Sequence, residues 1–443
     1  MRDAALWWIR RDLRLQDQPA LIEAASAGSV IPVFVLDDRL LRASGAPRRE
    51  FLARALAGLD AGLRPHGSSL VVRSGDPVEV IPQLAEEAGA GSVHVSADFG
   101  PYGSERDRAV EAALGQTPLV RTGSPYAVAP GRVSTQSGSP FQVFTPFYRA
   151  WLQHGWRAPA AVDPGTVDWQ AVDGEPLPAF DGEPITEADA IDAWQDFRDR
   201  RLGDYPDDRD RPDLDGTSRM SAYLRWGLLH PRTLLADLGP KDEAFRKELA
   251  WREFYASVLA QWPASARHYF RPELSELPYV GGAIRDERLH AWADGRTGYP
   301  IVDAGMRQLL TTGWMHNRLR MIVASFLVKD LQIEWQFGAR HFMRHLIDGD
   351  VASNQHGWQW AAGSGTDAAP YFRIFNPTTQ GKRFDPDGDF VRSMVPELDH
   401  LPGAAAHEPW RRDDGYANGY PIQIVDHAEQ RIAALEAYSD LRR

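Results

Sequence analysis

The first 125 residues alternate short apolar runs with longer amphipathic segments, and this alternation constrains the fold more than any other feature of the chain. Five runs have the composition of buried strands: LWWI, VIPVFVL, LVVR, SVHV and PLVRT. The segments between them have helical periodicity, over residues 19–25, 48–63, 78–88 and 105–114. Strands that alternate with helices predict a parallel, doubly wound sheet. We therefore expect an α/β domain over residues 1–125.

The rest of the chain has a different pattern. Residues 126–203 are rich in Pro, Gly and Asp, which predicts a long connector. Helical periodicity dominates from residue 204 onward. It predicts helices over 217–226, 243–261, 285–293, 301–311, 316–331 and 338–346. Because 443 residues exceed one ordinary core, we expect an all-α domain over residues 204–443 in addition to the α/β domain.

Several classes of site are disfavoured by what the sequence lacks. The chain has no cysteine, which excludes disulfides, thiolate metal sites and cysteine nucleophiles. No Gly-x-Gly-x-x-Gly follows the first predicted strand, so a dinucleotide in that position is not indicated. His341 and His345 lack a third ligand at a metal-site spacing, and we expect no metal. No apolar run has the length of a signal peptide or membrane span, which predicts a cytoplasmic protein without a membrane partner.

The net charge of −12 hides an asymmetry along the chain. Residues 241–383 contain 18 Lys and Arg against 15 Asp and Glu, a balance of +3, so the other 300 residues carry −15. A locally cationic surface on an acidic protein is compatible with binding phosphates, because the local field governs the encounter. A solvated mixture of surface charges is the alternative.

The segment 313–383 combines indoles, cations and amides more densely than any other part of the chain. It contains Trp314, Trp335, Trp358 and Trp360, interleaved with Arg and Lys. Ordinary cores are built from Leu, Ile and Val, since Trp is too large to be fully buried often. The segment therefore predicts a site for flat, conjugated molecules, although Trp314 is equally explained by core packing.

Two further patterns point to the same kind of ligand. Glu248 and Trp251 are three residues apart in a predicted helix and share a face, where a carboxylate can hydrogen-bond a planar ring and an indole can stack on it. A core Trp beside a surface Glu is the alternative. Residues 217–221 open a predicted helix, which favours an anion or simply a cap. These patterns fit an aromatic cofactor, nucleic-acid bases, or both.

At these motifs the chain closely resembles the cryptochrome/photolyase family. The resemblance begins at WWIRRDLRLQDQPAL and continues through TSRMSAYLRWG, ELAWREFY, TGWMHNRLRMIVASFLVKDL, IDGD and GWQWAAGSGTDAAPYFRIFNPTTQGKRFD. It covers essentially the whole chain and is closest to class I cyclobutane pyrimidine dimer photolyases. It implies an N-terminal antenna domain and a C-terminal helical FAD-binding domain.

The resemblance also implies a function. Family enzymes act on UV-damaged DNA that contains pyrimidine dimers, and excited reduced FAD donates an electron that splits the flipped-out lesion. We expect such an enzyme, a monomeric deoxyribodipyrimidine photo-lyase. A cryptochrome-type blue-light photoreceptor without repair activity is the alternative.

The family's FAD site is carried over residue by residue. Arg320 matches the ion-pair partner of Asp348, and Asn354 matches the residue that faces N5 of the flavin. The positions that match the FAD site are Tyr205, Thr217, Ser218, Arg219, Met220, Ser221, Phe245, Arg320, Asp348, Gly349, Asp350 and Asn354.

The family's lesion pocket is carried over in the same way. Glu248 resembles the carboxylate that hydrogen-bonds the dimer, Trp251 and Trp360 resemble the two indoles that hold the bases, and Met321 resembles the methionine on the pocket floor. Photolyases for (6-4) lesions tend to have Gln and His at the positions of Glu248 and Met321. Further DNA-contacting positions are Arg209, Asn317, Arg318 and Gln380.

One departure from the family concerns electron transfer. The family reduces its flavin through three Trp, and Trp358 and Trp335 match the inner two. No Trp aligns with the outer one. Tyr279 occupies a similar Leu-Pro-aromatic context, followed by a short insertion. We expect Tyr279 or another aromatic residue to end the path, or photoreduction to be impaired.

The antenna chromophore is the last expectation from the resemblance. Arg48 and Asp98 resemble positions that hold 8-hydroxy-5-deazaflavin in some members. Other members use methenyltetrahydrofolate, a second flavin such as FMN, or none. The sequence favours the deazaflavin.

Overall fold

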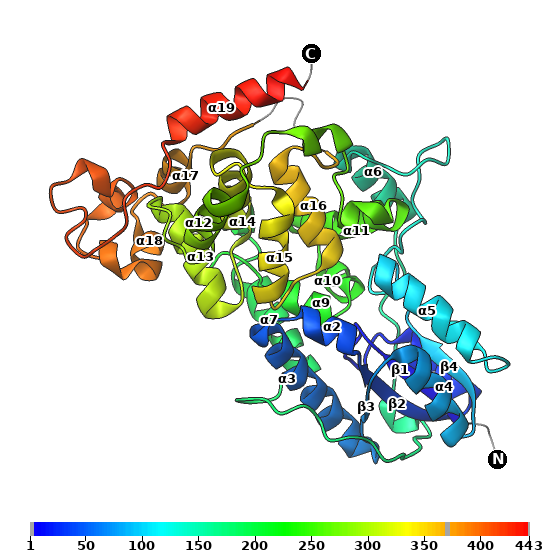
Figure 1. Ribbon diagram of the computed structural model, residues 1–443. Helices are drawn as coiled ribbons and strands as arrows, with labels where there is room; N and C mark the ends of the chain where they lie inside the picture. Colours follow the sequence, from blue (N-terminus) through cyan, green and yellow to red (C-terminus); the bar gives the residue numbers. More distant parts are fainter. Residues whose placement is uncertain (1–3, 368–372, 442–443) are drawn as a thin grey trace. The chain divides into compact units, whose positions relative to one another are not determined.

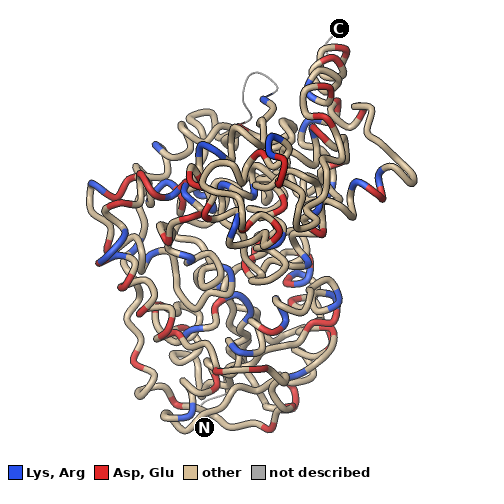
Figure 2. The backbone as a smooth tube through the Cα atoms, turned by 90° about the vertical axis from the view of Figure 1, so that its left-hand side faces the viewer, with Lys and Arg blue, Asp and Glu red and all other residues tan. Residues whose placement is uncertain are grey.

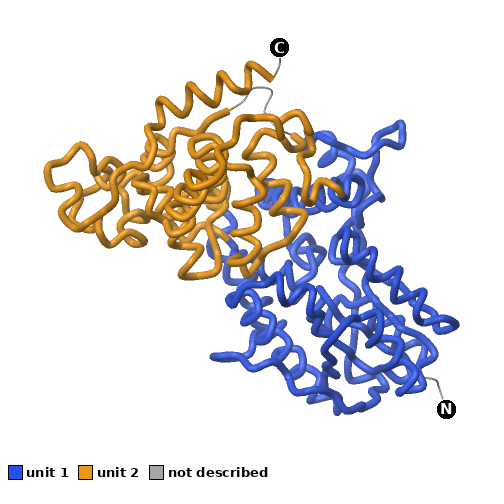
Figure 3. Tube along the Cα trace, in the orientation of Figure 1, with its two compact units in different colours: residues 1–203, 218–263 blue, residues 204–217, 264–443 orange. Residues whose placement is uncertain are grey.

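A computed structural model of the chain describes residues 4–367 and 373–441. The chain forms two compact units (Figure 3). Unit 1 comprises residues up to 203 together with 218–263, and unit 2 comprises residues 204–217 and 264–443. The predicted domain boundaries remain a proposal, because the chain crosses between the units more than once.

The core of unit 1 is a five-stranded parallel sheet with the strand order β3-β2-β1-β4-β5. Two of its strands, β1 and β2, are almost entirely buried apolar runs, which is typical of a parallel sheet covered on both faces. They are β1 (Ala4–Ile9), β2 (Ser29–Leu36), β3 (Val71–Ser74), β4 (Ala90–Val95) and β5 (Leu119–Arg121). The predicted doubly wound α/β sheet is confirmed, with each strand within two residues of its predicted limits.

Helices connect the strands (Figure 1). They are α1 (Pro19–Ala27), α3 (Ala46–Leu63), α4 (Pro77–Glu87) and α5 (Pro101–Ala113), at the predicted places. α4 and α5 pack side by side. The sequence did not predict α2 (Asp38–Ala43), which buries no residue and therefore has no apolar stripe.

The predicted connector contains two helices that its Pro and Gly content obscured. They are α6 (Phe144–His154) and α7 (Glu187–Arg200). α6 buries four aromatic side chains on one face, including Phe144 and Trp151. The C-terminal part of unit 1 adds α9 (Ser221–Trp226), α10 (Pro231–Asp237) and α11 (Glu243–Gln261), of which α11 has its predicted limits.

Unit 2 is helical, as predicted, and no helix among the described residues is both long and apolar enough to cross a membrane. Its α-helices are α8 (Tyr205–Asp208), α12 (Gly282–Ala293), α13 (Pro300–Thr312), α14 (Asn317–Ser325), α15 (Trp335–His345), α16 (Val351–Ala362), α17 (Pro377–Phe384), α18 (Asp389–Met394) and α19 (His427–Asp440). A large apolar core joins α13 to α16 and reaches α18.

The helix predicted over residues 316–331 is interrupted. After α14 the chain forms a π-helical turn, Phe326–Asp330, in which the amide of Leu331 donates to the carbonyl of Phe326. All residues of this turn are buried, including Lys329 and Asp330. Asp330 accepts a hydrogen bond from His427, at the start of α19. The π-helical turn therefore lies where the C-terminal helix packs.

Candidate functional site

The helix α16 presents Asn354 and Trp358 one turn apart on the same face. Asp350 caps the helix, accepting a hydrogen bond from the amide of Ser353 at 3.1 Å. The buried Asn354 side chain donates to the carbonyl of Ala339 in α15, at 3.2 Å, and to Gln355. The amide predicted to face a flavin is therefore held by α15.

Trp358 lies against α15 at a glycine. A Cβ atom at Gly338 would be 2.1 Å from Cη2 of Trp358, so only glycine admits the indole there. Gly338 is three residues after Trp335 and thus one turn along the same helix. Both indoles are buried, with exposures of 2% and 0%. The Trp358 indole therefore packs against α15 one turn away from Trp335, so the structure brings the two predicted electron-transfer residues close together.

The aromatic path continues outward from Trp335 through two tyrosines. The Tyr269 ring centroid is 6.1 Å from that of Trp335, edge to face, and 6.3 Å from that of Tyr279. Tyr279 is only partly buried, and its hydroxyl donates to the carbonyl of Leu274 at 3.2 Å. Burial raises the pKa of Tyr279 to about 12 and that of Tyr269 further. Both phenols are therefore protonated at neutral pH.

Gln359 fixes this path from within α16. Its side-chain oxygen accepts a hydrogen bond from the amide of Phe270 at 2.7 Å, and its amide donates to the carbonyl of Ser265 at 2.9 Å. Gln359, which lies between Trp358 and Trp360 in the sequence, is fully buried. The segment that carries Tyr269 is thus tied to the helix that carries Trp358.

The predicted ion pair joins Arg320 of α14 to Asp348, in the loop between α15 and α16. Arg320 donates to Oδ2 of Asp348 at 2.7 Å and to the carbonyl of Met315 at 2.8 Å. The Asp348 carboxylate is 1% exposed, and among the described residues its Oδ1 has no hydrogen-bond donor. A buried carboxylate oxygen in this state is the kind of group that a ligand hydroxyl or amino group satisfies.

The residues predicted to bind the flavin's phosphates belong to both units, since unit 2 includes residues 204–217 and unit 1 continues from residue 218. In unit 1, Ser218 accepts a hydrogen bond from the amide of Met220, and Arg219 has a positive φ of 52° just before α9. In unit 2, the buried Tyr205 lies in α8 with the Arg209 guanidinium 5.4 Å from its ring. Phe245, predicted to flank the flavin, packs against Trp194 in unit 1.

Glu248 and Trp251 lie half-buried on α11. The Trp251 indole stacks on Phe144 of α6, with ring centroids 3.7 Å apart and an angle of 6° between the planes. Phe254 packs edge-on at 5.6 Å. Phe144 thus covers one face of the indole that is predicted to hold the lesion. Sequence analysis did not identify it.

Several predicted DNA-contacting residues gather at α14 and α17 in unit 2. Arg318, in the first turn of α14, approaches the Met321 sulfur at 3.8 Å and the Phe384 ring at 4.4 Å. Asn317 is exposed, whereas Gln380 of α17 is 9% exposed. Trp360 is partly buried against the core of unit 2.

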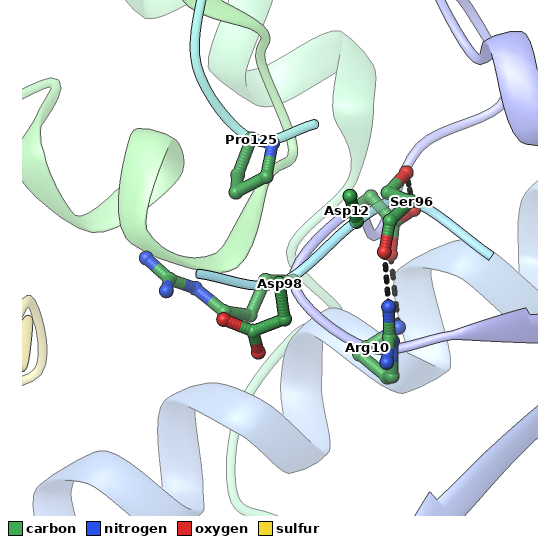
Figure 4. A pocket seen from close by; sticks show the side chains of 7 residues that line it. Arg10, Asp12, Ser96, Asp98 and Pro125 are labelled. Carbon is green, nitrogen blue, oxygen red and sulfur yellow. Dashed lines mark hydrogen bonds between the residues drawn. The ribbon is translucent and has the colours of Figure 1, made fainter. Parts of the chain in front are cut away.

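A pocket in unit 1 lies at the carboxyl ends of β1 and β4 (Figure 4). The chain runs from β1 to one side of the sheet and then crosses to β4 on the other, so this is the topological switch point where α/β sheets bind ligands. The lining residues are Arg10, Arg11, Asp12, Ser96, Ala97, Asp98 and Pro125.

The charges in this pocket are mutually compensated. Burial raises the pKa of Asp98, but Arg11, Arg106 and Arg10 lower it more, so that its pKa falls below the ordinary value. Asp12 accepts hydrogen bonds from the Arg10 amide and the Ser96 hydroxyl. The structure therefore brings Asp98 to the pocket. Arg48, the other residue predicted to hold the antenna chromophore, does not line this pocket. Its guanidinium lies 5.8 Å from the centroid of the Trp226 ring.

Comparison with protein families gives two matches. Residues 5–165 match a model described as DNA photolyase, and residues 245–440 match one described as the FAD binding domain of DNA photolyase. The chain belongs to the DNA photolyase family. This confirms the resemblance found in the sequence and FAD as the cofactor of the family's helical domain.

Curated relatives in the family match the chain from end to end. A deoxyribodipyrimidine photo-lyase of Escherichia coli is 40% identical, covering 99% of both chains. One from Streptomyces griseus is 42% identical, covering 95% of this chain and 96% of the relative.

Solved structures of the family have the same fold. A class III photolyase from Agrobacterium tumefaciens is 35% identical with a TM-score of 0.92, covering 100% of this chain and 98% of the other. An archaeal photolyase from Sulfolobus tokodaii with two FAD molecules is 28% identical with a TM-score of 0.86, covering 98% and 99%. A Synechocystis cryptochrome is 27% identical with a TM-score of 0.87, at the same coverage.

Gly338, Tyr269, Gln359 and Phe144 contact residues of the candidate site and were not predicted from the sequence. Each contributes through a contact with a residue distant in sequence, so no local spacing indicated it. The only sequence signal for these residues was that some lie in or near motifs that resemble the family, and the resemblance assigned no role to any of them.

Proposed function

We propose that this chain is a light-driven DNA repair enzyme that splits cyclobutane pyrimidine dimers. The observation that carries the proposal is the end-to-end match, at about two-fifths identity, to relatives named deoxyribodipyrimidine photo-lyase. The residues expected of such an enzyme support it, since Glu248 and Trp251 lie on one helix and Asn354 and Trp358 on another. When bound, reduced FAD supplies the light-driven electron.

The chain's own residues orient the reactants. Arg320 holds the Asp348 carboxylate, whose Oδ1 has no donor among the described residues and would accept a hydrogen bond from the bound cofactor, and Asn354 presents an amide held by α15. The Trp251 indole, supported on one face by Phe144, offers its other face to the extruded bases. Glu248 hydrogen-bonds the lesion, and the cations around α14 contact phosphates without reading sequence.

The test is repair of a thymine dimer in duplex DNA by prereduced protein under blue light. We expect repair in light and none in darkness. Glu248→Ala should lower the repair yield more than it lowers FAD binding, whereas Glu243→Ala, at an exposed position of the same helix, should change neither. Bound FAD without repair would contradict the proposal and favour the cryptochrome-type photoreceptor.

We propose that Trp358, Trp335, Tyr269 and Tyr279 form the path by which the flavin is photoreduced. The ring distances of 6.1 and 6.3 Å support an outer end made of two tyrosines in place of the family's third Trp. Tyr279→Phe and Tyr269→Phe should each slow photoreduction of oxidised FAD and leave repair by prereduced enzyme unchanged. An unchanged photoreduction rate in both variants would eliminate the tyrosines.

We propose the switch-point pocket of unit 1 as the antenna site. Its arginines and buried carboxylates offer both donors and acceptors to the polar edge of a ring system such as 8-hydroxy-5-deazaflavin, and the two FAD molecules of the Sulfolobus relative make a second flavin the alternative. Asp98→Ala should reduce the absorbance of a chromophore co-purified from the natural host. Retained absorbance would place the antenna elsewhere.

The cytoplasmic location and the monomeric state remain predictions. Sedimentation of the purified protein tests the second, with a single species of 49.4 kDa expected.

A further inference from the structure

Arg318, a proposed DNA-contacting residue, is already engaged by an acidic side chain of its own unit. Its Nη2 donates to Oδ2 of Asp210 at 2.6 Å. The Arg318 side chain is 19% exposed and that of Asp210 is 34% exposed, so both are partly withdrawn from water. Such a pair is screened less by salt than a fully exposed one.

The rest of the Arg318 side chain is held in place as well. Its guanidinium lies 4.4 Å from the Phe384 ring centroid and its Nη1 lies 3.8 Å from the Met321 sulfur. The side chain is therefore oriented without DNA. The carboxylate of Asp210 occupies Nη2, one of the guanidinium nitrogens that a two-point contact with a phosphate would use.

The same arrangement occurs at a second cation of the aromatic segment. Lys382 of α17 forms an ion pair with Glu408, which also pairs with Arg411 at 3.1 Å. Basic and acidic residues are interleaved along the chain (Figure 2). The surplus of only +3 over residues 241–383 is thus further reduced by internal pairing.

We propose that Asp210 is an internal competitor for DNA phosphate at Arg318. This inference rests on the proposed role of Arg318 in DNA binding. A phosphate that takes the Nη2 position on Arg318 must displace the carboxylate, and this cost applies equally to damaged and undamaged DNA. Asp210 therefore shortens residence on every duplex, and only a lesion held in the pocket gains enough contact to keep the protein bound.

The competition acts on affinity rather than on the number of ions released. A contact between Arg318 and a phosphate should release about 0.9 of a condensed cation in the wild type and in Asp210→Asn, because condensation belongs to the DNA and a lone carboxylate takes up few ions. The slope of log K against log salt should therefore be similar in the two proteins, and the difference between them should be a change in affinity.

The experiment measures fluorescence anisotropy of an undamaged duplex and of one with a single thymine dimer, at several salt concentrations. Asp210→Asn should bind both duplexes about two- to tenfold more tightly at low salt, since an ion pair of this exposure is of modest strength. Asp207→Asn makes the same charge change in α8 and should alter the affinity and the slope little. The melting temperature of each variant checks folding.

A double-mutant cycle isolates the pair. In the Arg318→Ala background, Asp210→Asn should no longer tighten binding. Equal tightening with and without Arg318 would reduce the effect to general charge and overturn the inference, as would unchanged or weaker binding by Asp210→Asn. If Arg318→Ala alone left affinity unchanged, the proposed role of Arg318 would fail instead.

Discussion

Two groups of buried indoles in this molecule differ in how their N–H groups are satisfied. In unit 1, Trp151 donates to Glu253 at 2.6 Å and Trp194 donates to Asp237 at 2.7 Å. In unit 2, Trp335 and Trp358 are equally buried, yet among the described residues neither indole N–H has an acceptor. An unsatisfied buried donor costs about 1–3 kcal/mol.

A buried indole normally finds a partner for its N–H. Trp335 and Trp358 are exceptions, and so is Trp7, a fully buried residue of β1 whose N–H also has no acceptor among the described residues. A missing acceptor alone therefore does not identify a functional indole. Trp151, by contrast, helps to fix the connector, because Glu253 also accepts hydrogen bonds from the amides of Ala127 and Val128.

The largest effect should come from removing either proposed electron carrier. Trp358→Phe and Trp335→Phe should slow photoreduction of oxidised FAD by more than about tenfold, since phenylalanine is far harder to oxidise, a barrier increase above about 1.4 kcal/mol. The flavin absorbance under blue light with external reductant measures the rate. Trp151→Phe is the control and should retain the rate. A comparable loss there would abolish the distinction between the two groups.

The second effect is a pH dependence of the free energy of unfolding that arises from Glu253, the hydrogen-bond acceptor of Trp151. Burial raises the pKa of Glu253 to about 7, although its hydrogen bonds oppose this. The folded form therefore holds a proton that the unfolded form releases near its ordinary pKa of about 4.3. This contribution to stability is full below the unfolded pKa and is lost as the pH rises through 7, a fall of up to about 4 kcal/mol.

Urea unfolding at pH 5 and pH 8 measures this contribution. Glu253→Gln should lose less stability over that interval than the wild type, because an amide does not titrate. An identical loss in both proteins would show that Glu253 is ionised throughout. Comparing the two proteins cancels the contribution of other groups, such as the buried Asp303.

The third test uses two glycines next to the proposed path. Gly338→Ala should destabilise the protein by about 1–3 kcal/mol, because its Cβ would overlap the Trp358 indole, and should also slow photoreduction. A Cβ atom at Gly357, inside α16, would meet no side chain or neighbouring element within 4 Å among the described residues. Gly357→Ala should therefore gain about 0.5–1 kcal/mol. Thermal unfolding of both variants decides whether α15 admits a side chain at Gly338.

The smallest expected effect is the difference in lost stability between a Trp→Phe variant of one group and a Trp→Phe variant of the other. Trp151→Phe removes a hydrogen bond to a carboxyl group, whereas Trp335→Phe removes an N–H that has no acceptor among the described residues. Both leave a similar cavity, so Trp151→Phe should lose more stability by about 1.5 kcal/mol. Denaturant unfolding at pH 8 gives the difference. Equal losses would mean that the Trp335 N–H is satisfied in solution.

The sheet was predictable because its strands are buried on both faces. β2, for example, is the apolar run VIPVFVL with one added residue, and no partner needs to be known to recognise it. α16 was not predicted. Its buried face contains Asn354, His356 and Gln359, and their burial depends on partners in α15 and the 265–270 segment.

The candidate site was predictable only in part, for the same reason. The spacing of Glu248 and Trp251 placed them on one helix, and the resemblance supplied roles for individual positions. Tyr269 was not found, because its proximity to both Trp335 and Tyr279 arises from the fold of a loop that Gln359 anchors. Long-range hydrogen bonds to polar side chains leave no periodic trace in a sequence.

The π-helical turn at Phe326–Asp330 has a consequence for the register of the chain. A turn with one residue more than an α-helical turn rotates everything after it by about 100° relative to an uninterrupted helix. This rotation is what turns Asp330 toward His427. Deleting one residue from the turn would restore an ordinary helical register and remove the Asp330–His427 contact, which would leave the start of α19 attached through the hydrogen bond from the His427 amide to Tyr299.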